Sequence, residues 1–264
     1  MQIKDKSILL TGATGGIGRL VAQKLHATGV HLILSCYVSD SLEELITDLG
    51  GNHTGVCADI STEEGRLAIL ESCIENGGVD GVVNLAGILD FNLFENQSEV
   101  LLERMIAINL IAPILLTRKL LPLLQEREES VVLNVGSIFG SIGHPGFSAY
   151  CATKSGLMRF SEALSRELAD TRVRIAYIAP RATQTRLNDD RVNDMNEELG
   201  NKSDTPSYVA EEIIAMLESK AAVRYLGWPE KLFVMLNAVL PAAVGSALTK
   251  NLSTIRRFAE RQRN

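Results

Sequence analysis

The chain has 264 residues, of which 46% are hydrophobic and 22% are charged, and this length suits one large α/β domain. A formal net charge of −6 argues against a nucleic-acid partner, because no basic field covers the surface. The four cysteines show neither a C-x-x-C pair nor metal-ligand spacing, so we expect no metal and no disulfide framework. We expect buried or half-buried thiols, no secretory signal and a cytoplasmic, reducing location.

The first motif is a strand, a glycine-rich turn and a helix. Residues 7–11 form a short apolar run, the turn follows, and apolar residues then recur at helical spacing. Backbone N–H groups at such a helix N-terminus bind a pyrophosphate. Gly12 would allow the sharp turn, Gly16 would admit a phosphate, and Gly18 would let the helix pack closely. The turn lacks the Gly-Lys-Ser/Thr ending of a P-loop.

Two further strands, predicted at 31–35 and 56–58, end at positions that normally face adenosine. The tip of the first carries Cys36 and Tyr37, which are neither acidic nor basic, so the choice between NAD and NADP stays open. The other strand ends at Asp59, which we expect at the adenine edge of the cofactor site. In the alternative reading, Asp59 or Ser61 is the N-cap of the next helix.

A helix at 63–76 and a strand at 79–83 lead to Asn84-Leu85-Ala86-Gly87, where small residues permit close approach of a ligand. Residues 99–124 are apolar at helical spacing on more than one face, which predicts a subunit contact in addition to packing on the sheet. The buried amide of Asn109 in this helix needs partners, either backbone groups at a local distortion or a bound water.

A strand at 131–135 is followed by Ser137 and then by Tyr150-Cys151-Ala152-Thr153-Lys154. A spacing of four places Tyr150 and Lys154 on one face of a helix. We expect the ammonium to lower the pKa of the phenol, which would suit the pair to proton transfer. Taken alone, this common spacing is more often an incidental Tyr and Lys on an exposed helix.

In the second half, a strand at 173–179 precedes the polar segment 181–204, which is either a mobile lid over the substrate or an ordinary surface excursion. A helix at 206–218 and a strand at 222–226 follow. Beyond Trp228, apolar pairs recur at helical spacing up to Pro241, and a basic end follows. This region is too short and broken to span a membrane. It could lie on an anionic lipid surface, extend a lid, or serve as a dimerisation arm.

Taken in order, Thr11-Gly12-x-x-x-Gly16-x-Gly18, Asp59, Asn84-x-Ala86-Gly87, Asn109, Ser137 and Tyr150-x-x-x-Lys154 closely resemble the short-chain dehydrogenase/reductase family. The resemblance covers about residues 5–227. It implies an α/β fold with a doubly wound parallel sheet (Rossmann fold) of about seven strands with helices on both faces. We expect a catalytic domain at 1–227 and a helical extension at 228–264.

The resemblance also assigns roles. Tyr150 would exchange a proton with the substrate oxygen, Lys154 would lower its pKa and bind the nicotinamide ribose, and Ser137 would hold the substrate oxygen. Asn109 would anchor a water that links Lys154 to solvent. The residues implied to contact NAD(P)(H) are Gly12, Thr14, Gly16, Ile17, Gly18, Cys36, Tyr37, Asp59, Ile60, Asn84, Ala86, Gly87, Tyr150, Lys154, Pro180, Thr183 and Thr185.

Three positions depart from the family pattern. Leu85 replaces a second asparagine, and Gly15 stands where NADP-dependent members often have a basic residue. Arg181 replaces a glycine, so its backbone would be strained if that position requires a positive φ.

The expected function is interconversion of a carbonyl and a secondary alcohol on a hydrophobic, acyl or lipid-like small molecule, of the 3-oxoacyl reductase type. Alternatives are an oxidising steroid- or retinol-type alcohol dehydrogenase and a non-catalytic dinucleotide-binding regulator. We further expect a homodimer or homotetramer, with peripheral membrane contact through the extension as one reading of that segment.

Overall fold

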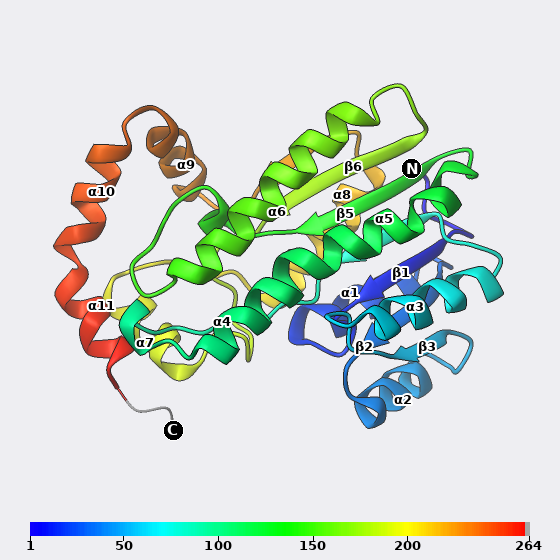
Figure 1. Ribbon diagram of the computed structural model, residues 1–264, viewed down its shortest axis with the longest axis horizontal. Helices are drawn as coiled ribbons and strands as arrows, with labels where there is room; N and C mark the ends of the chain where they lie inside the picture. Colours follow the sequence, from blue (N-terminus) through cyan, green and yellow to red (C-terminus); the bar gives the residue numbers. More distant parts are fainter. Residues whose placement is uncertain (262–264) are drawn as a thin grey trace.

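Seven parallel strands form one sheet, in the order β3-β2-β1-β4-β5-β6-β7, in the computed structural model, which describes residues 1–261. The order reverses between β1 and β4, so the sheet is doubly wound, and a crevice is expected at the carboxyl ends of these two strands. The predicted fold class is confirmed (Figure 1). The strands are β1 (Ser7–Thr11), β2 (His31–Cys36), β3 (Thr54–Cys57), β4 (Gly81–Asn84), β5 (Ser130–Val135), β6 (Val173–Ala179) and β7 (Val223–Tyr225).

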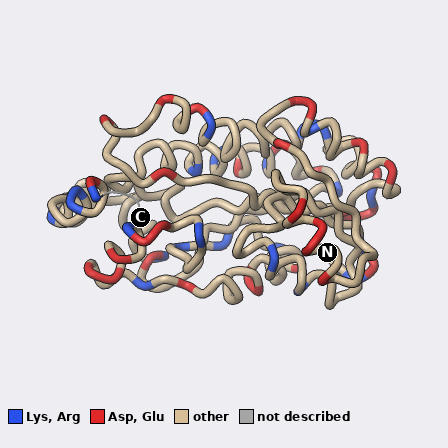
Figure 2. Tube along the Cα trace, turned by 90° about the horizontal axis from the view of Figure 1, so that it is seen from below, with Lys and Arg blue, Asp and Glu red and all other residues tan. Residues whose placement is uncertain are grey.

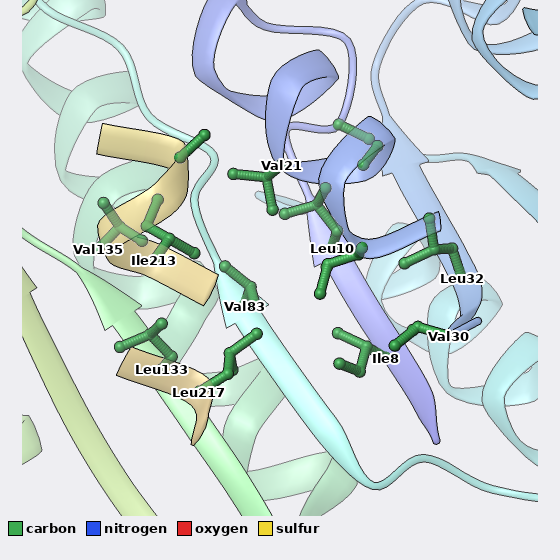
Figure 3. Packing of buried hydrophobic residues seen from close by; sticks show 14 of the residues in the cluster. Ile8, Leu10, Val21, Val30, Leu32, Val83, Leu133, Val135, Ile213 and Leu217 are labelled. Carbon is green, nitrogen blue, oxygen red and sulfur yellow. The ribbon is translucent and has the colours of Figure 1, made fainter. Parts of the chain in front are cut away.

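Helices cover both faces of the sheet because its strands are apolar on both sides. In β1, Ile8 and Leu10 pack on one face and Leu9 packs on the other, as the two-residue period of a strand requires. Figure 3 shows the first face, where Ile8 and Leu10 lie beneath Val21. That face is covered by α1 (Gly16–His26), α2 (Ser39–Asp48) and α8 (Pro206–Glu218), and the other by α3 (Glu63–Glu75), α5 (Ala112–Gln125) and α6 (Ser148–Glu167).

The predicted helix at 99–124 is one run with a wider turn inside it. It comprises α4 (Glu99–Ile106), a π-helical turn (Ala107–Ile111) and α5. The run is long and apolar enough to cross a membrane by length and composition, with a mean hydropathy of 1.8. In this fold, however, Leu116, Leu120 and Leu124 are buried in the core that α5 shares with α3 and the sheet. Part of its apolarity therefore serves packing within the domain, whereas Val100, Ile106 and Ile111 are exposed, and the subunit contact stays a prediction.

The C-terminal extension is helical, as predicted. It comprises α9 (Glu230–Val239), α10 (Pro241–Lys250) and α11 (Leu252–Ala259), and Pro241 marks the break between the first two. Figure 1 shows α9 and α10 projecting beyond the sheet, whereas α11 returns to lie beside α7 (Asp190–Glu198). Acidic and basic residues are interspersed along the chain in Figure 2.

Two expectations about single residues are wrong. Cys57 is exposed rather than buried, because it lies at the end of the edge strand β3. Arg181 is not strained, because the only non-glycine residue with a positive φ in residues 1–261 is Asp5. Instead, Arg181 donates hydrogen bonds to Asp204 at 2.6 Å and to Glu230 at 3.0 Å, which ties β6 to the polar segment and to α9.

Replacing Arg181 should therefore destabilise the protein. Arg181→Ala leaves two largely buried carboxylates, Asp204 and Glu230, without their cation, and we expect a loss of about 3 kcal/mol in the free energy of unfolding. The matched control is Arg159→Ala, which breaks an exposed ion pair with Glu162 and should cost less than about 1 kcal/mol. Urea unfolding of both variants measures the difference, and equal losses would contradict a structural role for the Arg181 cluster.

Candidate active site

A cavity of about 600 Å³ lies at the carboxyl ends of the strands, where the sheet order reverses. Its lining extends from the glycine turn after β1 to the start of α6 and includes part of the polar segment after β6. The structure thus brings together residues from stretches that are far apart in the chain. The lining residues that were predicted from sequence are Gly12, Thr14, Gly16, Ile17, Gly18, Cys36, Tyr37, Asp59, Ile60, Ala86, Gly87, Ser137, Tyr150, Lys154, Pro180, Thr183 and Thr185.

The glycine turn is shaped as a cradle that side chains would fill. Gly12 has a φ of 68°, and a Cβ there would lie 2.8 Å from the Ala86 Cα atom. A Cβ on Gly18 would collide with the carbonyl oxygen of Gly12. A Cβ on Gly16 would lie 3.3 Å from the side chain of Thr185, on the opposite wall. The backbone is therefore open to a pyrophosphate at the N-terminus of α1, and the residues present fit a dinucleotide.

The expected adenosine end of the cavity is formed by Cys36, Tyr37, Asp59 and Ile60. Asp59 accepts hydrogen bonds from the backbone N–H of Ser61 at 2.9 Å and from its hydroxyl at 2.6 Å. These bonds hold the pKa of Asp59 below its usual range, although partial burial opposes them. Neither Asp59 nor Ser61 is the N-cap of α3. That position belongs to Thr62, so the N-cap alternative for Asp59 is wrong.

The expected reactive end is formed by Ser137, Tyr150 and Lys154. Ser137 follows β5, and its backbone is held by the Tyr177 hydroxyl, which receives the Ser137 N–H and donates to the Ser137 carbonyl. Tyr150 and Lys154 lie in the first turns of α6 and are 8% and 4% exposed. The Lys154 ammonium nitrogen lies 5.6 Å from the centre of the Tyr150 ring. It donates a hydrogen bond to the Val135 carbonyl at 3.1 Å. The incidental, exposed reading of the pair is therefore wrong.

Burial controls the titration of both side chains. It raises the pKa of Tyr150 above its ordinary value, and a hydrogen bond with Ser137 opposes this only in part. Burial lowers the pKa of Lys154 to about 8. The expected lowering of the Tyr150 pKa by the ammonium is therefore not observed, and burial has the largest influence on this phenol. At neutral pH this site holds a protonated phenol and an ammonium.

The buried lysine should make stability depend on pH. The pKa of Lys154 is about 8 in the folded protein and near its ordinary 10.5 in the unfolded chain, so between these values the unfolded state binds more protons. Its destabilising contribution is complete below pH 8 and disappears as the pH rises to 10.5. We expect the stability gained by Lys154→Met to shrink by about 3 kcal/mol over this window.

Chemical denaturation of wild type and Lys154→Met at several pH values measures this change. Lys220→Met, at an exposed position, is the matched control and should show a constant difference from wild type. A constant difference for Lys154→Met as well would contradict the inferred burial of its charge.

The amides of Asn109 and Asn84 do not line the cavity. Asn109 accepts a hydrogen bond from the Ile88 N–H and donates one to the Ile88 carbonyl, both at 2.8 Å. Asn109 lies in the π-helical turn, so the expectation of backbone partners at a local distortion is confirmed. Its oxygen lies just behind Gly87. Asn84 donates to Asn134 at 2.8 Å within the core of the sheet. The Asn84 side chain therefore joins neighbouring strands β4 and β5, and the structure does not bring it to the cavity with the other predicted cofactor residues.

Several lining residues were not found from sequence. Arg104 lies over the Tyr37 ring, with its guanidinium carbon 5.6 Å from the ring centre. Leu187, Val192 and Met195 bring an apolar surface from the polar segment 181–204 to the cavity. The sequence did contain a signal for this surface: Val192 and Met195 are apolar residues three apart in a polar segment, and residues three apart share one face of a helix.

A second cavity, of about 1150 Å³, adjoins the first and shares Thr14, Gly16 and Thr185 with it. Its other walls carry the carboxylates Glu44, Asp190, Asp194 and Glu197. Arg19 and Arg186 also line it, so carboxylates outnumber guanidinium groups there. The dinucleotide fits the smaller cavity better, because that cavity holds the glycine turn together with Ser137, Tyr150 and Lys154. Among residues 1–261, no three His, Cys, Asp or Glu side chains come together in a way that could hold a metal ion.

Comparisons with known proteins agree on one family. A family model described as short chain dehydrogenase matches residues 6–196. Nodulation protein G of Rhizobium sp. (strain N33) is 32% identical over 200 residues, which cover 75% of this chain and 80% of that protein. The 3-oxoacyl-[acyl-carrier-protein] reductase of Bos taurus is also 32% identical over 200 residues, covering 75% of this chain and 83% of the relative.

A solved structure shows the same architecture. The 3-ketoacyl-(acyl-carrier-protein) reductase from Brucella melitensis, complexed with NADH, superposes with a TM-score of 0.77 at 27% identity. The match covers 84% of this chain and 96% of that one. Fold, ordered motifs and relatives agree, and the chain belongs to the short-chain dehydrogenase/reductase family of NAD(P)(H)-dependent oxidoreductases.

Proposed function

We propose that this enzyme reduces the carbonyl of a hydrophobic, acyl-type substrate, of the 3-oxoacyl thioester class, to a secondary alcohol. The observation that carries the proposal is the meeting of Ser137, Tyr150 and Lys154 in a cavity that also contains the glycine cradle. The glycine cradle would hold the pyrophosphate of a dinucleotide, and these three side chains line the same cavity.

The residues supply proton transfer and charge stabilisation. Bound NAD(P)H supplies the hydride to the carbonyl carbon. Tyr150 donates its phenolic proton to the carbonyl oxygen as negative charge develops there. Ser137 donates a hydrogen bond to the same oxygen, and the Lys154 ammonium stabilises the phenolate that Tyr150 becomes. Asn109 fixes the backbone at Ile88, next to Gly87, which keeps this wall in place.

The walls favour an apolar acyl chain. Ile138, Phe139 and Phe147, from the loop after β5, face the cavity together with Val192 and Met195 of α7. Burial of an acyl chain against such side chains is favourable at about 25 cal/mol per Å². The name of the Bos taurus relative supports the 3-oxoacyl class in particular.

The names of the relatives favour reduction over the oxidising steroid- or retinol-type alternative, since several are 3-oxoacyl-[acyl-carrier-protein] reductases. Tyr150 can serve either direction, because its phenol donates the proton in reduction and its phenolate accepts it in oxidation.

The test is turnover of 3-oxoacyl thioesters with acyl chains of increasing length, using NADPH and NADH in parallel. We expect oxidation of one reduced dinucleotide per 3-hydroxyacyl product and a KM that falls as the chain lengthens. The two titrations also decide the cofactor, which Cys36 and Tyr37 leave open. Turnover only of steroids or retinoids in the oxidising direction would favour the alternative.

A further inference from the structure

Helix α9 turns its polar side chains toward the body of the protein. Glu230 pairs with Arg181 at 3.0 Å, and the Asn237 amide donates a hydrogen bond to the Ser141 carbonyl at 2.8 Å. The residues on its outward side are apolar and exposed. We call them, with Trp228 before the helix and Leu240 after it, the apolar patch: Trp228, Leu232, Phe233, Met235, Leu236, Val239 and Leu240.

This arrangement is the reverse of a surface helix in water, which buries its apolar stripe and exposes its polar face. No residue of α9 is buried, and α10 buries only Val244. Met235 and Val239 are 68% and 76% exposed. By contrast, α11 packs normally, with Ile255, Phe258 and Ala259 in a core cluster. The protein therefore holds an apolar surface outward by specific polar contacts.

Most of α9 and α10, which we call the arm, is uncharged, and its charges lie only at the two ends, at Glu230, Lys231 and Lys250. Residues 232–249 contain no Asp, Glu, Lys, Arg or His. The extension 228–264 carries six Lys or Arg residues and two Asp or Glu residues, although the whole chain has an excess of acidic residues. Beyond this segment, Arg257 and Arg261 pair with Glu198 and Asp194 of α7, so Lys250 and Arg256, which are exposed, are the cations available to a lipid surface. An amphipathic segment flanked by such cations is complementary to an anionic lipid surface.

We propose that α9 and α10 lie in the headgroup and acyl boundary of an anionic membrane, with the apolar patch inserted and the basic end at the headgroups. The patch is on a projecting arm rather than in a groove, so a fluid lipid surface accommodates it more readily than a protein partner (Figure 1). Each helix has 10 residues, half the length needed to span a bilayer, so the arm attaches without crossing.

Attachment would bring the lipid surface to a wall of the cavity. Asn237 of α9 contacts Ser141, which belongs to the loop between Ser137 and Tyr150 that forms that wall. The attachment itself is independent of the substrate, since no residue of the apolar patch lines the cavity.

Vesicle sedimentation tests the proposal with the full chain. Wild type should pellet with vesicles of phosphatidylcholine and phosphatidylglycerol, and less with phosphatidylcholine alone. The variant L232S/F233S/M235S/V239S should bind the anionic vesicles roughly tenfold more weakly or worse. Its melting temperature and its NAD(P)H affinity should match wild type, because these side chains contact neither the core clusters nor the cavity. The matched control is I74S/F94S/V100S, at exposed apolar positions elsewhere, which should pellet like wild type.

Two results would overturn the proposal. One is equal pelleting of wild type and the patch variant. The other is a combination of two observations: wild type does not bind vesicles, and in sedimentation velocity without lipid the patch variant is a smaller species than wild type. That combination would assign the apolar patch to contact with a second copy of this chain. Both readouts leave dinucleotide binding and turnover of a water-soluble thioester as separate tests of the proposed function.

Discussion

Tyr150→Phe is expected to lower kcat for carbonyl reduction by roughly 10²–10⁴-fold while leaving the affinity for NAD(P)H unchanged. The substitution removes one hydroxyl from a buried ring and keeps its packing against Phe139, so the fold should be retained. The loss arises because the remaining hydroxyl, that of Ser137, is a much weaker acid than a phenol and can only hydrogen-bond the carbonyl oxygen as it becomes an alkoxide. Steady-state kinetics measure the rate, and quenching of protein fluorescence by the dinucleotide measures binding.

Tyr225→Phe is the matched control. Its hydroxyl also makes a hydrogen bond, with the Ser141 hydroxyl at 3.0 Å, but it does not line the cavity. We expect kcat within a few fold of wild type, since removing one neutral hydrogen bond costs about 1 kcal/mol of stability and no catalytic group. If Tyr150→Phe turned over a verified substrate at the wild-type rate, the proton-donor role of Tyr150 would be refuted.

Gly18→Ala is expected to weaken dinucleotide binding by at least roughly tenfold. A Cβ at Gly18 would meet the carbonyl oxygens of Gly12 and Ala13, which are backbone atoms and cannot move aside as a side chain can. Overpacking of this kind typically costs about 1–3 kcal/mol. The turn must open to relieve it, which displaces the N–H groups that face the pyrophosphate. Titration with NADH and NADPH measures the affinity, and thermal unfolding measures the cost to the fold.

Gly143→Ala provides the comparison for this substitution. Nothing lies within 4 Å of a Cβ at Gly143, so the added methyl group should leave both dinucleotide affinity and stability close to wild type. Wild-type affinity in Gly18→Ala would show that the cradle geometry is not what holds the dinucleotide.

Much of the fold was predictable because its signals are local. The apolar run 7–11, the glycine turn and the helix that follows are specified by neighbouring residues, and their structure matches the prediction. The same holds for Tyr150 and Lys154, whose spacing of four fixes their shared face. Asn109 was marked as unusual by its apolar neighbours, and the π-helical turn supplies the partners it needed.

The rest depends on contacts that the sequence does not show. Asn84 was assigned to the cofactor because of its place after a strand, yet its partner Asn134 lies 50 residues away on β5. Arg181 stands where a glycine is usual and would be strained only at a positive φ, which it does not adopt, and its two carboxylate partners are distant in sequence. The direction of the Tyr150 pKa shift was missed because it depends on burial by several elements rather than on the neighbouring lysine. The outward orientation of α9 likewise follows from contacts with Ser141 and Arg181.

The most direct test of the central claim is to supply the enzyme with reduced dinucleotide carrying deuterium at the transferable position, together with a 3-oxoacyl thioester, and to analyse the product by mass spectrometry and NMR. The account predicts a 3-hydroxyacyl product with deuterium on the carbinol carbon, formed by wild type and not by Tyr150→Phe. Binding of the dinucleotide without its oxidation, across the acyl series and a panel of apolar ketones, would contradict it and favour the non-catalytic regulator.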